Sequence, residues 1–162
     1  MNKIISIHPF KHEYASNFKS LNLEWIEEFF IVEQEDIKIL SNPEEYVLAK
    51  GGEIFFAKQN GEIIGTSAMI RSGPKTFELA KMAVTKSNQG NGVGKMLMGA
   101  CLKFAREQEA EQVFLVTNDI LEPALELYKS SGFMIDLNYD DQRYKRGNTK
   151  LILQLNCLSG DL

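Results

Sequence analysis

Three closely spaced glycines join an apolar run to an amphipathic segment, and this junction limits what the chain can fold into. The run Phe77–Val84 ends in a short polar link, Gly90, Gly92 and Gly94 follow, and an apolar stripe at helical spacing begins at Val93. Glycine lets backbone N–H groups approach a bulky anion closely. A helix N-terminus at the same point favours negative charge there. The junction therefore predicts a strand, a turn and a helix arranged around a phosphate or pyrophosphate.

Two common phosphate-binding motifs do not fit this junction. A P-loop needs an earlier glycine where Gln89 stands and a Ser or Thr where Met96 stands. A dinucleotide fingerprint that starts at Gly90 would need its last glycine where Lys95 stands. A glycine-rich turn without any ligand remains the alternative at this stage.

The rest of the chain alternates between strand and helix patterns. Asn60-Gly61 and Ser72-Gly73-Pro74 are turn sequences that join successive strands into an antiparallel meander. Apolar residues at helical spacing predict helices over 14–29, 93–104 and 121–128, and Pro123 and Gly132 punctuate the last of them. Strands are expected at Ile4–Ile7, Ile54–Gln59, Ile63–Arg71, Phe77–Val84, Val113–Thr117, Phe133–Leu137 and Lys150–Leu155.

This order predicts an α+β fold with a mixed, mostly antiparallel central sheet of about seven strands and helices on both faces. No linker divides the chain, so residues 1–162 are expected to form a single domain. The chain is 44% apolar and 25% charged, which is typical of a globular protein.

The composition also excludes several classes of partner. The net charge of −4 argues against nucleic acid, which requires concentrated Lys and Arg. No apolar run approaches the ~20 residues that cross a bilayer, and the N-terminus does not resemble a signal peptide, so we expect no membrane partner and a cytoplasmic location. Cys101 and Cys157 fit neither a metal spacing nor a disulfide framework. We expect two reduced thiols, with Cys101 in or near the core.

The glycine junction resembles a known family motif. Gln89-Gly90-Asn91-Gly92-Val93-Gly94 reads as Q-x-x-G-x-G, behind ELAKMAV and ahead of KMLMGACLKFA, and is similar to the acetyl-CoA-binding motif of the GNAT superfamily of N-acetyltransferases. Downstream, VFLVTNDILEPALELYKSSGF resembles the next strand and helix of that family. The resemblance covers Phe77–Phe133 and implies acetyl-CoA as cosubstrate, with no metal.

The resemblance implies a GNAT fold in which the strand that ends at Val84 and the strand Val113–Thr117 run parallel and splay apart to bind CoA. The pantetheine arm pairs with β-strand backbone in this opening, and the Met82 N–H stabilises the oxyanion. Twelve residues are expected to contact the cofactor: Met82, Ala83, Val84, Gln89, Gly90, Asn91, Gly92, Val93, Gly94, Lys95, Asn118 and Tyr128.

The chemistry requires a base and favours an acid. An amine with a pKa near 10.4, the reference value for lysine, is almost entirely protonated at neutral pH and must lose a proton before it attacks the thioester. Glu78 aligns with a glutamate often used for this in the family; the alternative is a solvated glutamate, or one paired with Lys75 or Lys81. Tyr128 stands in the family position of the proton donor to the CoA thiolate.

The acceptor side is less defined by the sequence. Trp25 and Phe29 are candidates for the wall of the acceptor pocket, although aromatic residues at helical spacing usually belong to a core. The histidines His8 and His12 are expected at the surface or at a helix cap. A solvated helical face and its exit are expected to hold the acidic group Glu24, Glu27, Glu28, Glu33, Glu35 and Asp36.

The sequence thus predicts an N-acetyltransferase that moves an acetyl group from acetyl-CoA to a primary amine of a small molecule or peptide, by direct attack in a ternary complex. Two alternatives stay open: transfer of a longer acyl group, and a CoA-binding sensor or interaction module without turnover. A homodimer through the edge of the strand Lys150–Leu155 is a further expectation.

Overall fold

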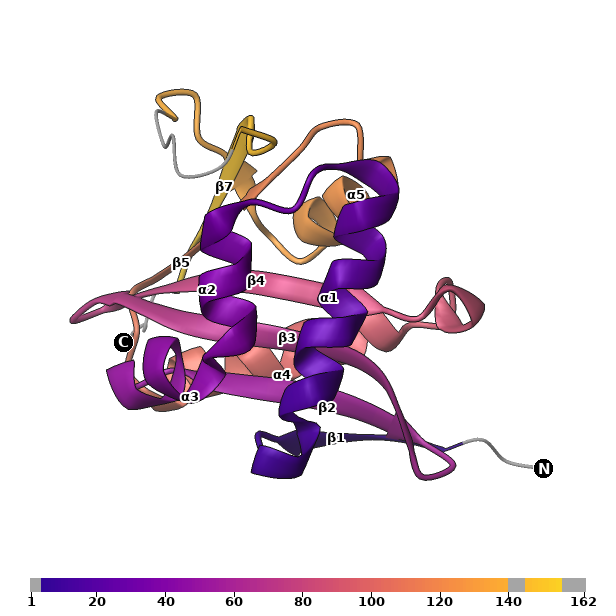
Figure 1. The fold of residues 1–162 in the computed structure, drawn as a ribbon. Coiled ribbons are helices and arrows are strands. Elements are labelled where there is room, and N and C mark those ends of the chain that lie inside the picture. The colour runs from indigo at the N-terminus through magenta and orange to yellow at the C-terminus, as the bar shows by residue number, and fades with distance from the viewer. Residues whose placement is uncertain (1–3, 140–144, 156–162) are drawn as a thin grey trace.

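The computed structural model describes residues 4–139 and 145–155, which excludes the predicted thiol Cys157. In these ranges the strands form one mixed sheet in the order β1-β2-β3-β4-β5-β7-β6 (Figure 1). The strands are β1 (Ile5–Pro9), β2 (Glu53–Gln59), β3 (Glu62–Gly73), β4 (Thr76–Val84), β5 (Gln112–Thr117), β6 (Met134–Ile135) and β7 (Thr149–Gln154). The α-helices are α1 (Ala15–Phe29), α2 (Gln34–Ser41), α3 (Pro43–Tyr46), α4 (Val93–Glu107) and α5 (Glu122–Ser130), and 3₁₀ turns cover His12–Tyr14, Leu48–Lys50 and Lys86–Asn88.

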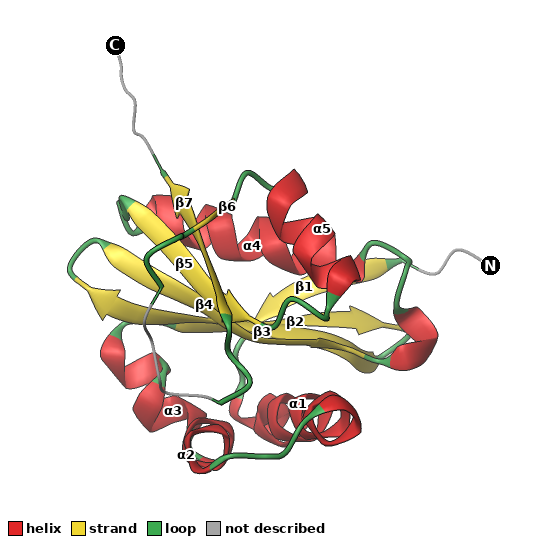
Figure 2. Cartoon of the chain, turned by 90° about the horizontal axis from the view of Figure 1, so that it is seen from above, coloured by secondary structure: helices red, strands yellow, loops and turns green. Residues whose placement is uncertain are grey.

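Helices cover both faces of the sheet, as predicted. Figure 2 shows α1, α2 and α3 below the strands and α4 and α5 above them. The stripe of α1, with Phe18 and Ile26 fully buried, packs on Phe56 of β2. On the other face, Cys101 of α4 is fully buried against Phe77 of β4, which confirms its predicted place in the core. The two faces therefore have separate cores, one cluster under α1 to α3 and, on the α4 side, a large cluster and a smaller one made of Ala57, Ile64, Val93 and Leu97.

The predicted meander and the splayed pair are both confirmed. β1 to β4 pair with one another in antiparallel order, and β4 pairs with β5 in parallel. The parallel ladder is short: its last pair is Glu78 with Phe114, although β4 continues to Val84 and β5 to Thr117. Beyond Glu78 the two strands have no ladder between them, so an opening forms inside the sheet.

A β-bulge interrupts β4 beside this opening. Ala80 pairs with Ala68 and Ala83 pairs with Thr66, so β4 has one residue more than β3 over this stretch. Lys81 lies in the bulge with φ of 56°, in the left-handed region that side chains rarely adopt. The bulge breaks the alternation of side chains between the two faces.

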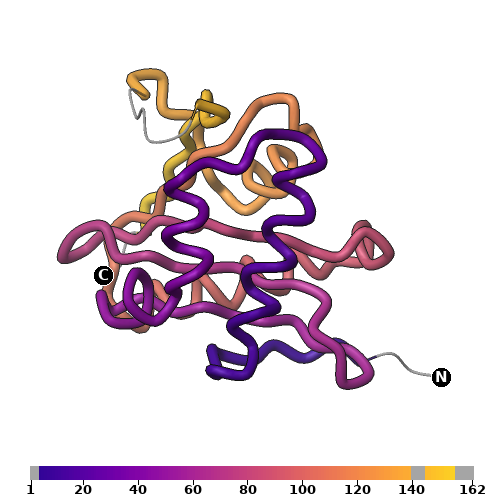
Figure 3. Tube along the Cα trace, viewed as in Figure 1, coloured from indigo at the N-terminus to yellow at the C-terminus, as the bar shows by residue number. Residues whose placement is uncertain are grey.

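Three features differ from the sequence prediction. The chain between α1 and β2 contains α2, which runs beside α1, and the single turn α3 that follows it (Figure 3). Only Met134–Ile135 of the predicted strand Phe133–Leu137 pairs. β7 lies between β5 and β6, so it is not the edge strand that the dimer expectation assumed.

Candidate active site

A cavity of about 650 Å³ opens where β4 and β5 separate. It reaches both faces of the sheet, because its lining includes Trp25 and Ile70, which pack against the core under α1, and Leu115 and Tyr128, which belong to the α5 side. Two ligands can therefore meet in one cavity while lying largely on opposite faces.

Nearly every residue predicted from the sequence lines this cavity. The set comprises Trp25, Phe29, Glu78, Met82, Ala83, Val84, Gln89, Gly90, Gly92, Val93, Gly94, Lys95, Asn118 and Tyr128. Asn91, the remaining predicted residue, is exposed and outside the lining.

The N-terminus of α4 is an uncapped group of backbone donors. Gly92 is the N-cap with φ of 81°, and no side chain hydrogen-bonds to the helix end. The first turn carries no acidic residue, and a Cβ added at Gly90 or Gly92 would meet no atom within 4 Å. The first turn of α4 thus has no side-chain cap, and the space over Gly90 and Gly92 is open. This is the arrangement that a phosphate needs.

Side chains brace the loop that leads to this helix. Gln89 Nε2 donates to the Val84 carbonyl oxygen at 3.1 Å, and Asn88 Nδ2 donates to Thr85 Oγ1 at 2.8 Å. Gln89 therefore closes the loop onto the end of β4. Lys86, at the outer side of the loop, pairs with Glu28 at 2.7 Å.

The end of β4 presents backbone groups to the opening. The Thr85 N–H donates to the Ile64 carbonyl oxygen at 2.9 Å, and the next pairs are Val84 with Gly65 and Ala83 with Thr66. In an antiparallel ladder, hydrogen-bonded and non-hydrogen-bonded pairs alternate. The backbone groups of Val84 are therefore directed away from β3, where the carbonyl oxygen accepts from Gln89 and the N–H is left toward the gap, while Met82 lies in the bulge outside the regular ladder.

Glu78 lies at the vertex of the opening. It faces Ile70 across the ladder, so its side chain is on the α1 face, and it is only 6% exposed. This burial excludes the solvated glutamate considered above, and Lys75 pairs instead with Glu109 at 4.0 Å. A buried carboxylate at the junction of the two halves of the cavity has the position required of a proton acceptor.

Tyr128 lies across the cavity on α5. Its ring packs edge-on against Phe133, with 6.3 Å between the ring centroids. Burial of the hydroxyl raises the pKa of Tyr128 to about 12, so it is protonated throughout the physiological range. No hydrogen bond engages this hydroxyl in the described part of the chain, which leaves its proton for a ligand.

Asn118 joins two segments by hydrogen bonds. Its Nδ2 donates to the Arg146 carbonyl oxygen at 2.8 Å, and its Oδ1 accepts from the Ile120 N–H at 3.0 Å. The side chain thus joins the end of β5 to the segment 145–148, which leads into β7.

Residues 16–133 match the sequence profile of the Acetyltransferase (GNAT) family. The chain belongs to the GNAT family. N-acetyltransferase 8 of Rattus norvegicus is 33% identical over 93 residues, which cover 54% of this chain and 42% of that protein. The match therefore spans less than half the length of this relative.

Solved structures show the same GNAT fold. A GNAT-family acetyltransferase from Staphylococcus aureus Mu50 superposes with a TM-score of 0.85 at 24% identity, covering 94% of this chain and 100% of the other. A GNAT-family acetyltransferase from Elizabethkingia anophelis, with acetyl-CoA bound, has a TM-score of 0.62 at 22% identity. The superposition covers 93% of this chain and 98% of the other.

Sequence reasoning missed one part of this GNAT domain, a buried ion cluster beside the bulge. Asp36 of α2 has no exposed surface, although it was expected on a solvated face. Lys81 Nζ lies 2.8 Å from Asp36 Oδ1, and the Arg146 guanidinium binds both Asp36 oxygens, with Nη1 at 2.8 Å from Oδ2. Arg146 Nη1 also lies 3.2 Å from Glu33 Oε2.

The cluster also caps α2. Asp36 Oδ2 accepts from the Glu33 N–H at 2.8 Å, which completes a capping box. Burial disfavours the Asp36 carboxylate, but hydrogen bonds from Arg146 and Lys81 outweigh it and hold the pKa of Asp36 below its usual range. Burial lowers the pKa of Lys81, against the attraction of Asp36 and, more weakly, Glu78. Lys81 and Arg146 line the cavity with their charges balanced.

The α1 side of the cavity is aromatic. The rings of Trp25 and Phe30 meet edge to face, with centroids 6.1 Å apart. Trp25 Nε1 donates to Asn22 Oδ1 at 3.4 Å, and Phe29 is 53% exposed. Trp25 and Phe29 thus lie at the cavity, as predicted, while Phe18 and Ile26 of the same helix fill the core.

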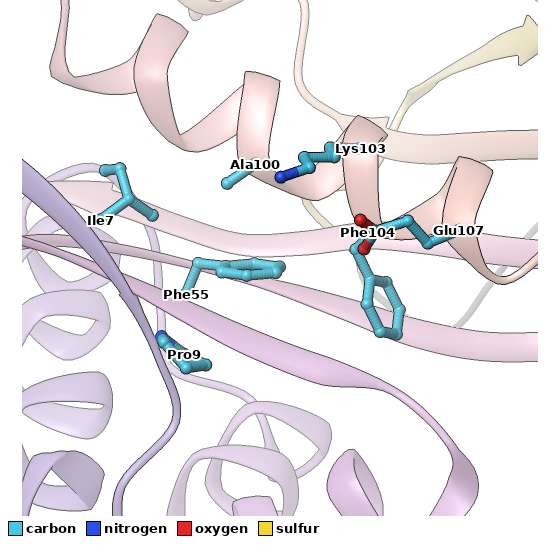
Figure 4. A pocket seen from close by; sticks show the side chains of 7 residues that line it. All are labelled: Ile7, Pro9, Phe55, Ala100, Lys103, Phe104 and Glu107. Atoms are coloured by element: carbon cyan, nitrogen blue, oxygen red, sulfur yellow. The ribbon is translucent and has the colours of Figure 1, made fainter.

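Other candidate sites in the described ranges are weaker. A second cavity of about 260 Å³ lies between β1, β2 and α4, and Figure 4 shows that it contains Lys103 and Glu107 but none of the predicted site residues. Residues 4–139 and 145–155 contain no group of three His, Cys, Asp or Glu side chains that could hold a metal ion. None of the helices in these ranges has both the length and the apolarity needed to cross a bilayer.

Proposed function

We propose that residues 1–162 form one catalytic domain, an N-acetyltransferase that moves an acetyl group from acetyl-CoA to a primary amine by direct attack in a ternary complex. One observation carries the proposal. β4 and β5 separate directly after Glu78, so the uncapped end of α4, the open backbone of β4 and a buried carboxylate share one cavity.

The cosubstrate fits the α4 and α5 side of this cavity. The first-turn N–H groups of α4 and the Lys95 ammonium bind the pyrophosphate, since both favour anions. The Met82 backbone and the Val84 N–H pair with the pantetheine amides as an added strand would. The acetyl-CoA bound to the related Elizabethkingia anophelis enzyme supports this assignment.

Acetyl-CoA supplies the acyl group as a thioester, and the side chains move two protons. Glu78 accepts the proton that the attacking amine loses, because the amine reaches the vertex from the α1 side. The Met82 N–H faces the carbonyl oxygen, where negative charge develops. Tyr128 donates its proton to the sulfur as the C–S bond breaks. One C–N bond forms and one C–S bond breaks. The free thiol leaves with the tyrosine proton, and the proton that Glu78 took from the amine replaces it through solvent.

The test separates turnover from binding. Release of free CoA thiol is followed over a panel of primary amines for the native chain and Glu78→Gln, and calorimetry measures the affinity for CoA. We expect amine-dependent release that Glu78→Gln lowers by about 10² or more, with unchanged CoA affinity. Binding of CoA without release for any amine would identify a sensor. Faster release from longer acyl-CoA donors would identify a different acyl preference.

A further inference from the structure

We propose that the acceptor is a primary amine carried on an apolar, ring-bearing body without a carboxylate. This inference rests on the proposed function and defines its acceptor class. Three observations on the α1 side of the cavity lead to it: the nature of the wall, the pairing of the nearby cations, and the number of acidic groups in the lining.

The wall is formed by apolar side chains from three elements. α1 and the residue after it contribute the aromatic group, and α2 and β3 contribute one isoleucine each: Trp25, Phe29, Phe30, Ile39 and Ile70. Aromatic surface of this extent favours a flat apolar ligand, because ring contacts add to the free energy of burial. The wall is therefore suited to a ring.

The apolar surface continues to the mouth of the cavity. Phe29 is 53% exposed and Ile120 is 64% exposed, and both line the cavity. Covering such side chains with apolar ligand surface removes that surface from water, which is favourable. A ligand with a polar or charged tail would leave these two side chains uncovered, whereas an apolar body covers them.

The two cations that line the cavity beside the bulge are already paired. Lys81 and Arg146 both bind Asp36, and Arg146 also binds Glu33. Carboxylate recognition usually relies on the planar fork of a guanidinium, and here that fork holds the Asp36 carboxylate. A carboxylate on the acceptor would lose water without gaining this fork, so the site discriminates against free amino acids.

The acidic groups limit the acceptor to one ammonium. Among the described residues that line the cavity, Glu78 is the acidic one, because Asp36 and Glu33 lie behind the cations. One amine can pair with Glu78 before it is deprotonated. The described lining offers a second ammonium no second carboxylate, so diamines and polyamines are disfavoured.

Trp25 makes the inference testable without turnover. It is the single tryptophan of the chain and lines the acceptor side, so its fluorescence reports ligand binding there. With CoA present, the chain is titrated with 2-phenylethylamine, ethylamine, phenylalanine and 1,4-diaminobutane. Compared with 2-phenylethylamine, ethylamine lacks the ring, phenylalanine adds a carboxylate, and 1,4-diaminobutane has a second amine in place of the ring. Release of CoA from acetyl-CoA is measured with the same four compounds.

We expect 2-phenylethylamine to bind at least about tenfold more tightly than each of the other three, and to have the highest kcat/KM. Phe29→Ala should weaken the binding of 2-phenylethylamine by about tenfold and leave the affinity for ethylamine unchanged, because only the ring contact is lost. The matched control is Ile37→Ala, which truncates a 44% exposed side chain of α2 outside the cavity and should change neither value.

The outcomes separate this inference from the proposed function. Equal or tighter binding of phenylalanine or diaminobutane overturns the acceptor class, even if CoA release proves the enzyme active. Selective binding of 2-phenylethylamine without CoA release from any amine supports the acceptor class and overturns the proposed turnover. An equal loss of affinity for 2-phenylethylamine and for ethylamine in Phe29→Ala contradicts the proposed contact between Phe29 and the ligand ring.

Discussion

Lys81 Nζ lies 2.8 Å from Asp36 Oδ1, although regular alternation along β4 would place residue 81 on the opposite face of the sheet. Glu78 faces Ile70 and Ala80 faces Ala68, so both point to the α1 and α2 face. The bulge adds Lys81 to the same face directly after Ala80, where the ammonium reaches α2. The ion pair therefore offsets the cost of the positive φ of 56° at Lys81, beside the active-site opening.

Asp36→Asn is expected to destabilise the fold. The substitution leaves the buried Lys81 and Arg146 cations without their shared carboxylate, and breaking such a buried pair costs roughly 3 kcal/mol. Urea unfolding measures the loss in the free energy of unfolding. The control Glu35→Gln changes a neighbouring acid in the same turn and should cost less than about 1 kcal/mol. Equal losses in the free energy of unfolding for the two variants would argue against a stabilising role of the ion cluster.

Acid stability provides a second measurement of this cluster. Because the folded pKa of Asp36 is lowered, the unfolded chain takes up its proton first as the pH falls. Asp36 thus contributes stability that is complete above its ordinary pKa of 3.8 and is lost as the pH falls through the lower folded pKa. We expect a shallower dependence of stability on pH below about 4 in Asp36→Asn than in the native chain.

Glu78→Gln is expected to lower kcat by about 10² near neutral pH and to leave CoA affinity unchanged. The loss should shrink at high pH, where the acceptor amine is already neutral and needs no base. Glu62→Gln, which changes an exposed glutamate of β3, is the matched control and should retain native rates. A native pH profile in Glu78→Gln would show that another group takes the amine proton.

Gly92→Ala is expected to weaken CoA binding by about tenfold or more, because one lost charge-assisted hydrogen bond costs roughly 1.5 to 3 kcal/mol. With φ of 81° at this N-cap, a Cβ strains the backbone by about 1 to 2 kcal/mol and turns the first-turn donors out of alignment. Gly99→Ala makes the same change inside α4, where the added Cβ has space. It should stabilise the chain by about 0.5 to 1 kcal/mol and leave CoA affinity, measured by calorimetry, at the native value.

Tyr128→Phe is expected to lower kcat by about tenfold to a thousandfold while CoA binding stays close to native. Since the pKa of Tyr128 is raised to about 12, the donor keeps its proton at every pH below about 10, and the ratio of native to variant rates should be constant over that range. An acyl donor with a more acidic thiol should restore part of the rate. Full activity in the variant would reduce Tyr128 to a packing residue on Phe133.

The parts of the molecule that local patterns determine could be predicted from the sequence. The meander follows from Asn60-Gly61 and Ser72-Gly73-Pro74, and α4 and its loop follow from the glycines and the stripe at Val93. The predicted cavity residues converge because they lie at the end of β4, at the start of α4 and on α5, elements that a strand–helix–strand order brings together.

The buried ion cluster and the bulge could not be predicted, because they depend on contacts between residues far apart in the sequence. Asp36 looks like one more acid of a solvated run, and only Lys81 and Arg146, 45 and 110 positions away, justify its burial. The bulge at Lys81 depends on the same contacts. α2 and α3 have eight and four residues, too short for a clear periodic pattern. The spacing of Glu33 and Asp36 fits a capping box, and this spacing could have indicated that a helix begins there.

The separation of β4 from β5 gives this sheet an edge in its interior. Edge strands at the rim of a sheet are hazards, since any chain with an unpaired strand can add to them and begin aggregation. Here α1 and α2 cover one face, α4 and α5 cover the other, and β5 is on the far side of the gap (Figure 2). A second polypeptide could pair there only by forcing β5 outward. The fold thus keeps backbone donors available to a slender ligand while protecting them from self-association.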